Sequence, residues 1–425
     1  MAEDKDLICY ELLLKVFRDN AYASIELNSA LKRSSPEIAP YVTKLFYGVL
    51  EKSIYYDYVI SKFATQKPKK PIAVIIKMGY YALENLNVPQ YAVVNNMVNL
   101  CKKVGKGGAS GFVNSVLRNF KQVELPKEGS LQYLSVRYSV PEWLCKVFVD
   151  DYGYDFTQKM LSYESDNKTH IRVNTANITQ EEFESKYCLH NNAEIERSKV
   201  GYYVSGKSLK GLKACDYVVQ SASSIAAVYA YLYKQGNITK ILDLCAAPGG
   251  KSVLLKTLTG AEVTACDIHK HRVELISQYA TKASVKINAM LNDATQFRPE
   301  WENKFDLVVC DVPCSGLGVI GSKPDILYNR TRNDIDELVE LQKKILLAAA
   351  RYVKPGGRLC YSTCTVIHEE NSGVVNDFLD NNDNFIRELI KSPYDDCEKE
   401  EITLFPHINR TDGFYVAALK KKTEK

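Results

Sequence analysis

The stretch LDLCAAPGGKS, residues 242–252, decides the fold class, because an apolar strand pattern runs through a small, glycine-bearing turn into a helical pattern. Gly249 and Gly250 have no side chains, so the turn can take positive φ angles and let backbone N–H groups approach a ligand closely. A Walker A loop begins with glycine, but Cys245 stands at that position, and the GxGxxG fingerprint of dinucleotide-binding folds is absent. The turn therefore predicts a nucleoside ligand without a pyrophosphate.

Apolar runs alternate with longer helical patterns from this turn to the end of the chain. One such helix is expected at about residues 334–353. The alternation predicts an α/β fold with a parallel, doubly wound sheet covered by helices on both faces. A last apolar run, residues 413–419, is expected to add an edge strand. The strand candidates are residues 240–245, 262–267, 286–291, 305–310 and 357–361.

The part of the chain before this fold has a different pattern. Residues 7–120 carry apolar residues at helical spacing, which predicts an all-helical domain, whereas residues 131–215 mix a helical start with short strand patterns. A chain of 425 residues is long enough for two or three domains. We expect an all-α domain at 1–125, a small α/β connecting segment at 126–215 and the α/β domain at 216–425.

The charge is distributed unevenly between these parts. Residues 1–123 carry 17 Lys and Arg against 10 Asp and Glu, whereas the remaining 302 residues carry 38 against 41. A basic helical N-terminal part, followed by a nearly neutral remainder, favours a polyanion as partner, with nucleic acid ahead of a membrane surface. Solvated lysines without any partner remain an alternative on charge alone.

The cysteines and the apolar runs bear on the cellular compartment. No run approaches the roughly 18 apolar residues that a membrane span needs, and the N-terminal sequence MAEDKDLICYELL lacks the basic start of a signal peptide. A soluble, cytoplasmic protein with no membrane partner is therefore expected. Its 12 cysteines are irregularly spaced and should be reduced there, so that thiol chemistry is available.

Acidic residues follow four successive strand candidates. They are Asp243, Asp267, Asp293 and Asp311. A single aspartate at the end of a strand is more often a turn former or a helix cap than a ligand contact. Ligands of open α/β sheets bind outside the carboxyl ends of the strands, where all four are expected. Asp267, 24 residues beyond Asp243, is suited to accept hydrogen bonds from ribose hydroxyls.

Two pairs of cysteines flank the ends of the last two parallel strand candidates. Cys310 and Cys314, like Cys360 and Cys364, are four residues apart. Extended residues at this spacing span about 13 Å, whereas the sulfurs of a zinc site lie roughly 4 Å apart, so no metal is expected. Cys310 and Cys360 are expected inside the sheet as small apolar residues, and Cys314 and Cys364 on adjacent loops at its carboxyl edge.

Four motifs in order resemble those of the S-adenosylmethionine-dependent RNA cytosine-C5 methyltransferases of the Sun (Fmu) family: LDLCAAPGGK, DVPCSGLGVIGSKPDI, YSTCT and DGFYVAAL. The N-terminal segment NVPQYAVVNNMVNLCKKVGKGGASGFVNSVLRNF resembles the NusB-like RNA-binding domain of the branch that acts on 16S rRNA, and YSVPEWLCKVF and HIRVNT resemble its connecting segment. The resemblance implies a Rossmann-like methyltransferase domain behind a NusB-like domain. It also implies the branch that modifies cytosine 967.

The resemblance implies roles for individual residues. The family's nucleophile, which adds to cytosine C6 and makes C5 nucleophilic, corresponds to Cys364, and the thiol that assists release corresponds to Cys314. Asp311 is expected near the target cytosine and the methyl donor. The residues expected to hold S-adenosylmethionine are Cys245, Ala246, Ala247, Pro248, Gly249, Gly250, Lys251, Asp267, Asp293 and Asp311.

The implied partner is 16S rRNA or an assembling small subunit, bound by a monomer. The target base must be unpaired or extruded. Basic residues of the helical domain are expected to contact phosphates: Lys67, Lys69, Lys70, Lys102, Lys103, Lys106 and Arg118. The sequence departs from the family pattern at Ser221, where an acidic residue is usual, and in the loop before PDI, where Lys323 is the only basic residue.

Two alternatives remain. The same reaction on transfer RNA or another RNA would need the same motifs, so the NusB-like domain favours ribosomal RNA without excluding them. A non-catalytic RNA-binding or ribosome assembly factor is a different class of function. It has no chemical need for both Cys314 and Cys364, and their presence favours the enzyme.

Overall fold

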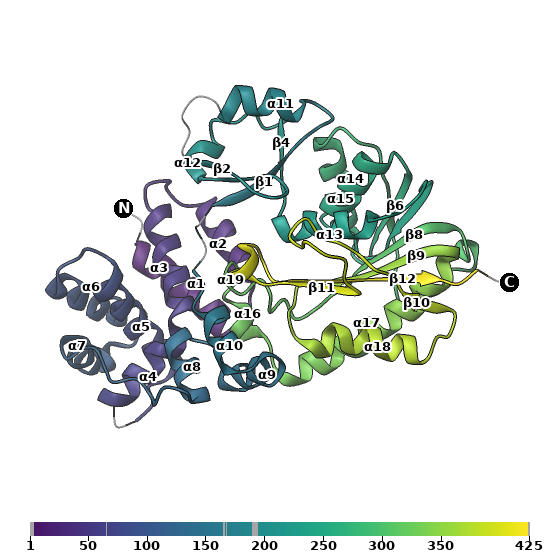
Figure 1. The fold of residues 1–425 in the computed structure, drawn as a ribbon. Helices are drawn as coiled ribbons and strands as arrows, with labels where there is room; N and C mark the ends of the chain where they lie inside the picture. The colour runs from purple at the N-terminus through teal and green to yellow at the C-terminus, as the bar shows by residue number, and fades with distance from the viewer. Residues whose placement is uncertain (1–3, 65, 165, 167, 189–193, 424–425) are drawn as a thin grey trace. The chain divides into compact units, whose positions relative to one another are not determined.

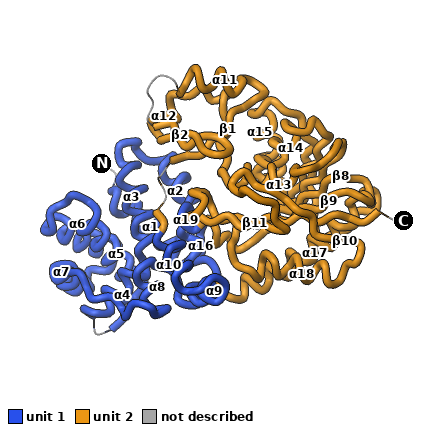
Figure 2. Tube along the Cα trace, viewed as in Figure 1, with its two compact units in different colours: residues 1–162, 320–330 blue, residues 163–319, 331–425 orange. Residues whose placement is uncertain are grey.

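The structure is a computed structural model that describes residues 4–64, 66–164, 166, 168–188 and 194–423, and Figure 1 shows its elements. Two compact units can be distinguished, as coloured in Figure 2. Unit 1 comprises residues 1–162 and 320–330, and unit 2 comprises residues 163–319 and 331–425. The division differs from the three domains expected from the sequence, whose boundaries stay a prediction.

Unit 1 is helical because its apolar residues recur at helical spacing and meet in one core. Leu13, Phe46 and Tyr80 are fully buried there, and the first helix begins where the side chain of Asp4 accepts a hydrogen bond from Leu7 N (3.1 Å). The helices are α1 (Lys5–Asp19), α2 (Ala23–Leu31), α3 (Ala39–Glu51), α4 (Ser53–Phe63), α5 (Lys70–Asn85), α6 (Gln90–Lys103), η1 (Gly107–Ala109), α7 (Ser110–Arg118), α8 (Leu131–Tyr138), α9 (Glu142–Tyr152), α10 (Tyr154–Leu161) and α16 (Ile326–Asn329).

The short helix α16 belongs to unit 1 although it lies about 160 residues beyond α10 in the chain. The buried carboxylate of Asp325 accepts a hydrogen bond from Ala23 N (3.2 Å), and Tyr328 donates one from its hydroxyl to the carbonyl of Leu50 (2.5 Å). The ring of Tyr328 also meets Phe17 edge to face at 5.1 Å. Residues 320–330, which follow the DVPC motif in the chain, therefore pack as part of unit 1.

Unit 2 begins with a small antiparallel sheet of strand order β2-β3-β1-β4. Phe183, Ile171 and Val204 are fully buried in its own apolar cluster. The elements are β1 (Thr169–Val173), α11 (Gln180–Phe183), η2 (Glu184–Cys188), β2 (Ile195–Arg197), β3 (Tyr202–Val204), α12 (Gly206–Leu209) and β4 (Tyr217–Val219).

The eight-stranded sheet of unit 2 has the order β10-β12-β9-β8-β5-β6-β7, with β11 paired to β12. Strands β5 to β9 pair in parallel, as expected, but β12 runs antiparallel to β9, β10 and β11. The expectation of an edge strand at residues 413–419 was therefore wrong, because β12 lies inside the sheet. The strands are β5 (Lys240–Asp243), β6 (Glu262–Asp267), β7 (Asn288–Leu291), β8 (Phe305–Asp311), β9 (Val353–Thr363), β10 (Phe385–Arg387), β11 (Glu401–Leu404) and β12 (Phe414–Lys421).

Helices cover both faces of this sheet, which confirms the doubly wound α/β architecture (Figure 1). One face packs on α13 and α14, and the other on α17 and α18. Within the described residues, no helix is long and apolar enough to span a bilayer. The remaining elements are α13 (Ala222–Leu232), α14 (Gly250–Thr259), α15 (Lys270–Lys282), η3 (Pro299–Trp301), α17 (Arg332–Tyr352), η4 (His368–Glu370), α18 (Ser372–Asp380) and α19 (Pro406–Asn409).

Candidate active site

The turn between β5 and α14 is closed tightly at the carboxyl edge of the large sheet. Gly249 has a φ of 109°, and a Cβ at this position would lie 3.2 Å from the Cα of Ile276. Its N–H donates to the carbonyl of Ala246 (2.7 Å), and Ala246 N donates to the carbonyl of Cys266 (2.8 Å) on β6. Only glycine suits this conformation and spacing, so the turn brings the start of α14, which no described side chain caps, to this edge of the sheet.

Asp243, the last residue of β5, is a fully buried carboxylate. Its Oδ2 accepts a hydrogen bond from Ser252 Oγ (2.5 Å), whereas its Oδ1 accepts none of good geometry from the described residues. Burial raises the pKa of Asp243 to about 6, although the hydrogen bonds from Ser252 and from the Cys245 backbone act to lower it. A buried oxygen of this kind is an acceptor suited to an N–H or ammonium group of a ligand.

Lys251 and Asp311 form an ion pair between the start of α14 and the end of β8. The distance from Lys251 Nζ to Asp311 Oδ2 is 2.6 Å, and both side chains are mostly buried. Burial disfavours the ammonium, but the Asp311 carboxylate outweighs this effect and raises the pKa of Lys251. The charge of Cys364 acts in the same direction, so the Lys251 ammonium lies where it would stabilise a Cys364 thiolate.

The other oxygen of Asp311 is held by a hydroxyl pair that the sequence did not indicate. Ser362 Oγ donates to Asp311 Oδ1 (2.9 Å), and Tyr231 OH lies 2.6 Å from Ser362 Oγ. Ser362 could have been suspected, since it stands two residues before Cys364 in YSTCT. Tyr231 lies on α13, 131 residues away, and no local pattern connects it to the site.

Cys314 and Cys364 are brought together by the pairing of β8 with β9. Asp311 is in register with Ser362 at the ends of these parallel strands, so the loops that follow are neighbours. The two Sγ atoms are 3.2 Å apart, and both thiols are partly exposed. The hydrogen bond with Cys364, followed by burial, raises the pKa of the Cys314 thiol well above its usual value. Cys314 is thus held as a thiol beside the second sulfur.

Asp267 and Asp293 lie at the same edge of the sheet, at the end of β6, which is next to β5, and just after β7, which is next to β6. Asp267, at the end of β6, accepts a hydrogen bond from His269 N (3.0 Å) and pairs with Arg272 (3.4 Å). Asp293, just after β7, accepts hydrogen bonds from the N–H and the hydroxyl of Thr295 (2.9 and 2.7 Å). Each carboxylate shapes its own loop, and Asp267 also follows Cys266, whose carbonyl accepts a hydrogen bond from Ala246 in the turn after β5.

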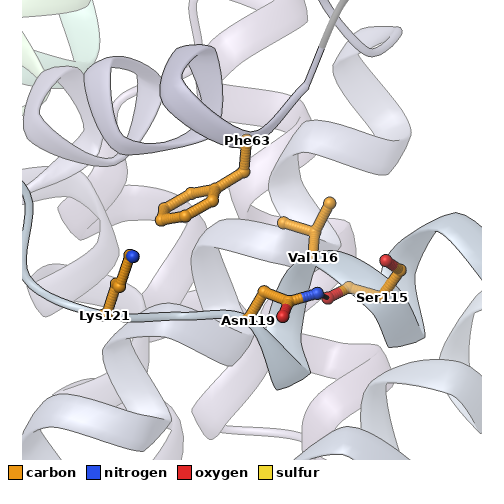
Figure 3. A pocket seen from close by; sticks show the side chains of 5 residues that line it. All are labelled: Phe63, Ser115, Val116, Asn119 and Lys121. Atoms are coloured by element: carbon orange, nitrogen blue, oxygen red, sulfur yellow. Dashed lines mark hydrogen bonds between the residues drawn. The ribbon is translucent and has the colours of Figure 1, made fainter.

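Unit 1 presents the basic residues expected to bind a polyanion. All seven side chains are exposed, but Lys70 donates to the carbonyl of Phe17 (3.0 Å) and Lys103 pairs with Asp4 (2.5 Å). A pocket of about 210 Å³ also lies in this unit, and Figure 3 shows the Phe63 ring over residues of α7 with a lysine ammonium beside it. The pocket is lined by Phe63, Ser115, Val116, Asn119 and Lys121.

Comparison with known proteins supplies the context of this site. The family model described as "16S rRNA methyltransferase RsmB/F" matches residues 230–420, and the NusB family model matches residues 8–122. The probable ribosomal RNA small subunit methyltransferase B of Bacillus subtilis is 32% identical over 444 aligned positions, covering 98% of both chains. The protein of the same name from Synechocystis is 30% identical, covering 97% of this chain and 98% of its own length.

Solved structures agree on the fold. The structure titled "Crystal Structure of PH0851" superposes with a TM-score of 0.79 over 99% of this chain and all of its own length, at 24% sequence identity. NSun6 from Pyrococcus horikoshii, solved with SFG, superposes with a TM-score of 0.55 over 67% of this chain and 99% of its own, at 19% identity. At these identities the superpositions establish the architecture alone.

Proposed function

Because this chain belongs to the family of 16S ribosomal RNA methyltransferases described as RsmB/F, we propose that it methylates C5 of a cytosine in small-subunit rRNA through a covalent adduct. Family membership makes the chain an S-adenosylmethionine-dependent enzyme that acts on RNA. The observation that carries the finer proposal is the pair of thiols 3.2 Å apart, next to the Lys251–Asp311 ion pair. A transfer to an amine or a carboxylate would need no such thiols.

The covalent route follows from the weak nucleophilicity of cytosine C5. Cys364 Sγ, as a thiolate favoured by the Lys251 ammonium, adds to C6 and makes C5 an enamine-like carbon that can accept a methyl group. S-adenosylmethionine supplies that methyl group as an activated sulfonium. The C5 proton then passes to a base, its bonding electrons restore the double bond between C5 and C6, and the bond between C6 and Sγ breaks to return the thiolate of Cys364. Cys314, 3.2 Å from this sulfur, is in position to assist the release.

Asp311 is proposed to position both reactants. One oxygen is held by Lys251 and the other by Ser362, so the carboxylate is fixed at the edge where β8 ends. A carboxylate fixed in this way can hydrogen-bond the exocyclic amine or the protonated ring of the cytosine and favour addition at C6. Its role is therefore electrostatic, and it forms no covalent bond to the substrate.

The residues around the turn fit S-adenosylmethionine. Asp243 Oδ1, which accepts no hydrogen bond of good geometry from the described residues, suits the ammonium of its methionine part. The N-terminus of α14, which no described side chain caps, suits its carboxylate. Asp267 and Asp293 are proposed for the ribose hydroxyls and the adenine side. The remaining contacts would come from the turn itself: Cys245, Ala246, Ala247, Pro248, Gly249, Gly250 and Lys251.

Unit 1 is proposed to bind the rRNA through its phosphates. The exposed lysines position RNA without reading its sequence, and Lys323, which also belongs to this unit, adds an exposed positive charge beyond the DVPC motif. Binding should therefore weaken steeply with salt. The particular cytosine, and whether a monomer acts on free rRNA or on an assembling subunit, belong to the same proposal.

The test is methylation of small-subunit rRNA that lacks the modification. We expect label from S-adenosylmethionine to appear as 5-methylcytosine, and Cys314→Ala to accumulate a protein–RNA adduct that survives a denaturing gel. Label that appears only in transfer RNA would show that transfer RNA, and not small-subunit rRNA, is the substrate. Methylation at a position other than C5, or no adduct with either Cys314→Ala or Cys364→Ala, would overturn the covalent route.

A further inference from the structure

Two adjacent buried residues, Glu370 and Asn371, contact the loops that carry the two thiols. They stand between the loop that carries Cys364 and helix α18, and their exposed fractions are 0% and 1%. Neither residue is among those proposed above to touch the cofactor or the cytosine. A buried carboxylate is expensive to desolvate, so its presence here calls for a physical explanation.

Glu370 holds the residues on both sides of Cys314. Its Oε2 accepts hydrogen bonds from Ser315 N (2.8 Å) and from Gln342 Nε2 (2.9 Å), and its Oε1 accepts one from Ser315 Oγ. Gln342 Nε2 also donates to the carbonyl of Pro313 (2.9 Å). The backbone before and after Cys314 is thus fixed to one carboxylate and its glutamine partner.

Asn371 holds the residues on both sides of Cys364. Its Oδ1 accepts a hydrogen bond from Thr363 Oγ1 (2.5 Å), and its Nδ2 donates to the carbonyl of Thr365 (3.2 Å). Both threonines are fully buried, whereas the cysteine between them is partly exposed. The amide therefore fixes the short segment from which Cys364 projects.

The two loops are also joined to each other. Ser315 Oγ lies 3.0 Å from Thr365 Oγ1, and Gly318 N donates to the carbonyl of Cys364 (3.0 Å). A Cβ on Gly318 would come within 2.8 Å of that carbonyl oxygen, so the approach requires glycine. Any movement of Glu370 or Asn371 would consequently change the separation of the two sulfurs.

The side-chain types match these contacts. Only a carboxylate accepts hydrogen bonds at both of its terminal atoms, and Glu370 receives its donors from the Cys314 loop and from α17. Asn371 must accept on one side and donate on the other, which requires an amide. Burial raises the pKa of Glu370, and the donors from Ser315, Gln342 and Thr365 act against that rise.

We propose that Glu370 and Asn371 are paired positioning residues, each of which serves one of the two halves of the reaction. Glu370 orients Cys314 for release, and Asn371 orients Cys364 for attack on C6. This inference rests on the proposed function, since it assigns each residue to one step of the covalent route. It adds to that function the two side chains that hold the loops of Cys314 and Cys364 at a fixed separation.

The test compares variants of the same shape. Glu370→Gln replaces one accepting oxygen by an amide donor, and Asn371→Asp replaces the donor to the Thr365 carbonyl by an acceptor. The matched controls are exposed residues of the same types. They are Glu369→Gln, whose carboxylate pairs with Arg332 (2.5 Å), and Asn381→Asp, whose amide donates to the carbonyl of Asp377 (2.7 Å).

Each variant is assayed for covalent RNA adduct on denaturing gels, for turnover, for S-adenosylmethionine binding and for thermal unfolding. We expect Glu370→Gln to lower kcat by about 10- to 100-fold and to accumulate adduct, as Cys314→Ala does, with unchanged cofactor affinity. Asn371→Asp should slow adduct formation when it is combined with Cys314→Ala. Both controls should behave as the unchanged protein, because neither contacts a thiol loop.

The outcomes separate this inference from the proposed function. If neither Cys314→Ala nor Cys364→Ala forms an adduct, the covalent route fails, and if Cys364→Ala alone does, the two thiols and the positioning roles assigned to them are exchanged. If Cys314→Ala forms the adduct, and Glu370→Gln turns over normally without adduct, or Asn371→Asp leaves adduct formation unchanged, the positioning role is wrong. Should Glu370→Gln fail to fold, Ser315→Ala removes a single donor to the same carboxylate and should show a smaller rise in adduct; normal turnover of that variant would equally overturn the role.

Discussion

Strands β8 and β9 each carry one cysteine and are each followed by a second, four residues further on, yet the two kinds of cysteine are in different chemical situations. Cys310 and Cys360 are fully buried on opposite faces of the sheet, one against α17 and α18 and the other against α13 and α14. Burial raises the pKa of Cys360 to about 12 and raises that of Cys310 well above its usual value. Both are inert apolar residues.

Cys314 and Cys364 lie just beyond the carboxyl ends of the same strands and are partly exposed. Their sulfurs are 3.2 Å apart, and the charge of Cys364 contributes to the raised pKa of Lys251. The residue type and the strands are the same in both pairs, so the difference lies in position alone. A thiol becomes reactive where parallel strands end, because the loops there bring charges and a second thiol together.

The largest expected effect is that of removing the thiol of Cys364. Cys364→Ala should lower formation of 5-methylcytosine by about 10⁴-fold or more, because without a thiolate at C6 the C5 carbon is not a nucleophile. Cofactor affinity should not change. Cys360→Ala, within strand β9, should keep normal turnover, and methylation assays with labelled S-adenosylmethionine measure both. Activity in Cys364→Ala with loss in Cys314→Ala would exchange the roles of the two thiols.

The second effect concerns the carboxylates of β8. Asp311→Asn should lower kcat by about 10²- to 10³-fold, because the neutral amide neither balances Lys251 nor stabilises the developing charge on the cytosine. The contact with Ser362 can survive, since the amide keeps one accepting oxygen. Single-turnover methylation at saturating RNA measures the loss. An equal loss in Asp306→Asn, at the opposite end of the strand, would show that the effect is structural.

The sequence predicted the parts of the site that adjoin an apolar strand. The acidic residues, the glycine turn and the loop thiols each directly follow such a strand, and the carboxyl ends of parallel strands meet at one edge. The expected β6, residues 262–267, was right to the residue, and β5, β7, β8 and β9 were right to within a few residues at each end.

The sequence could not predict what depends on distant pairing. The run that forms β12 looked like an edge strand, because nothing local shows that β10 and β11 pair with it. Likewise, no local pattern indicated that residues 131–161 and 320–330 belong with the helices of unit 1. Tyr231 and Gln342 reach the site from helices far along the chain, and a buried glutamate at position 370 has no sequence pattern that distinguishes it from the exposed Glu369.

The third prediction concerns the buried cysteines. Cys310→Ala and Cys360→Ala should each lower the free energy of unfolding by about 1 kcal/mol, because each removes one buried sulfur and leaves a small cavity. Cys397→Ala, at an exposed position, should leave it unchanged. Denaturant unfolding followed by fluorescence measures all three. A loss of turnover in either buried variant, without loss of folded protein, would remove the distinction between the two pairs.

The smallest expected effect concerns Asp306, at the end of β8 opposite the active site. Asp306, near the amino end of this strand, accepts hydrogen bonds from Lys354 Nζ (2.8 Å), Thr239 N (2.9 Å) and Lys240 N (2.8 Å). Burial alone would raise the pKa of Asp306, but these donors outweigh it and hold the pKa well below its usual range. A lowered pKa means that the folded state favours the carboxylate.

Asp306 therefore stabilises the fold above the usual aspartate pKa of about 4, and this stabilisation is lost as the pH falls towards the lower pKa of the folded state. At pH 7, Asp306→Asn should cost about 1 kcal/mol, because Lys354 loses a charged partner and the amide cannot receive all the donors. The difference from the unchanged protein should shrink steadily between about pH 4 and pH 2. Thermal unfolding across that range measures it, and a constant difference would mean that the carboxylate acts through packing and not through its charge.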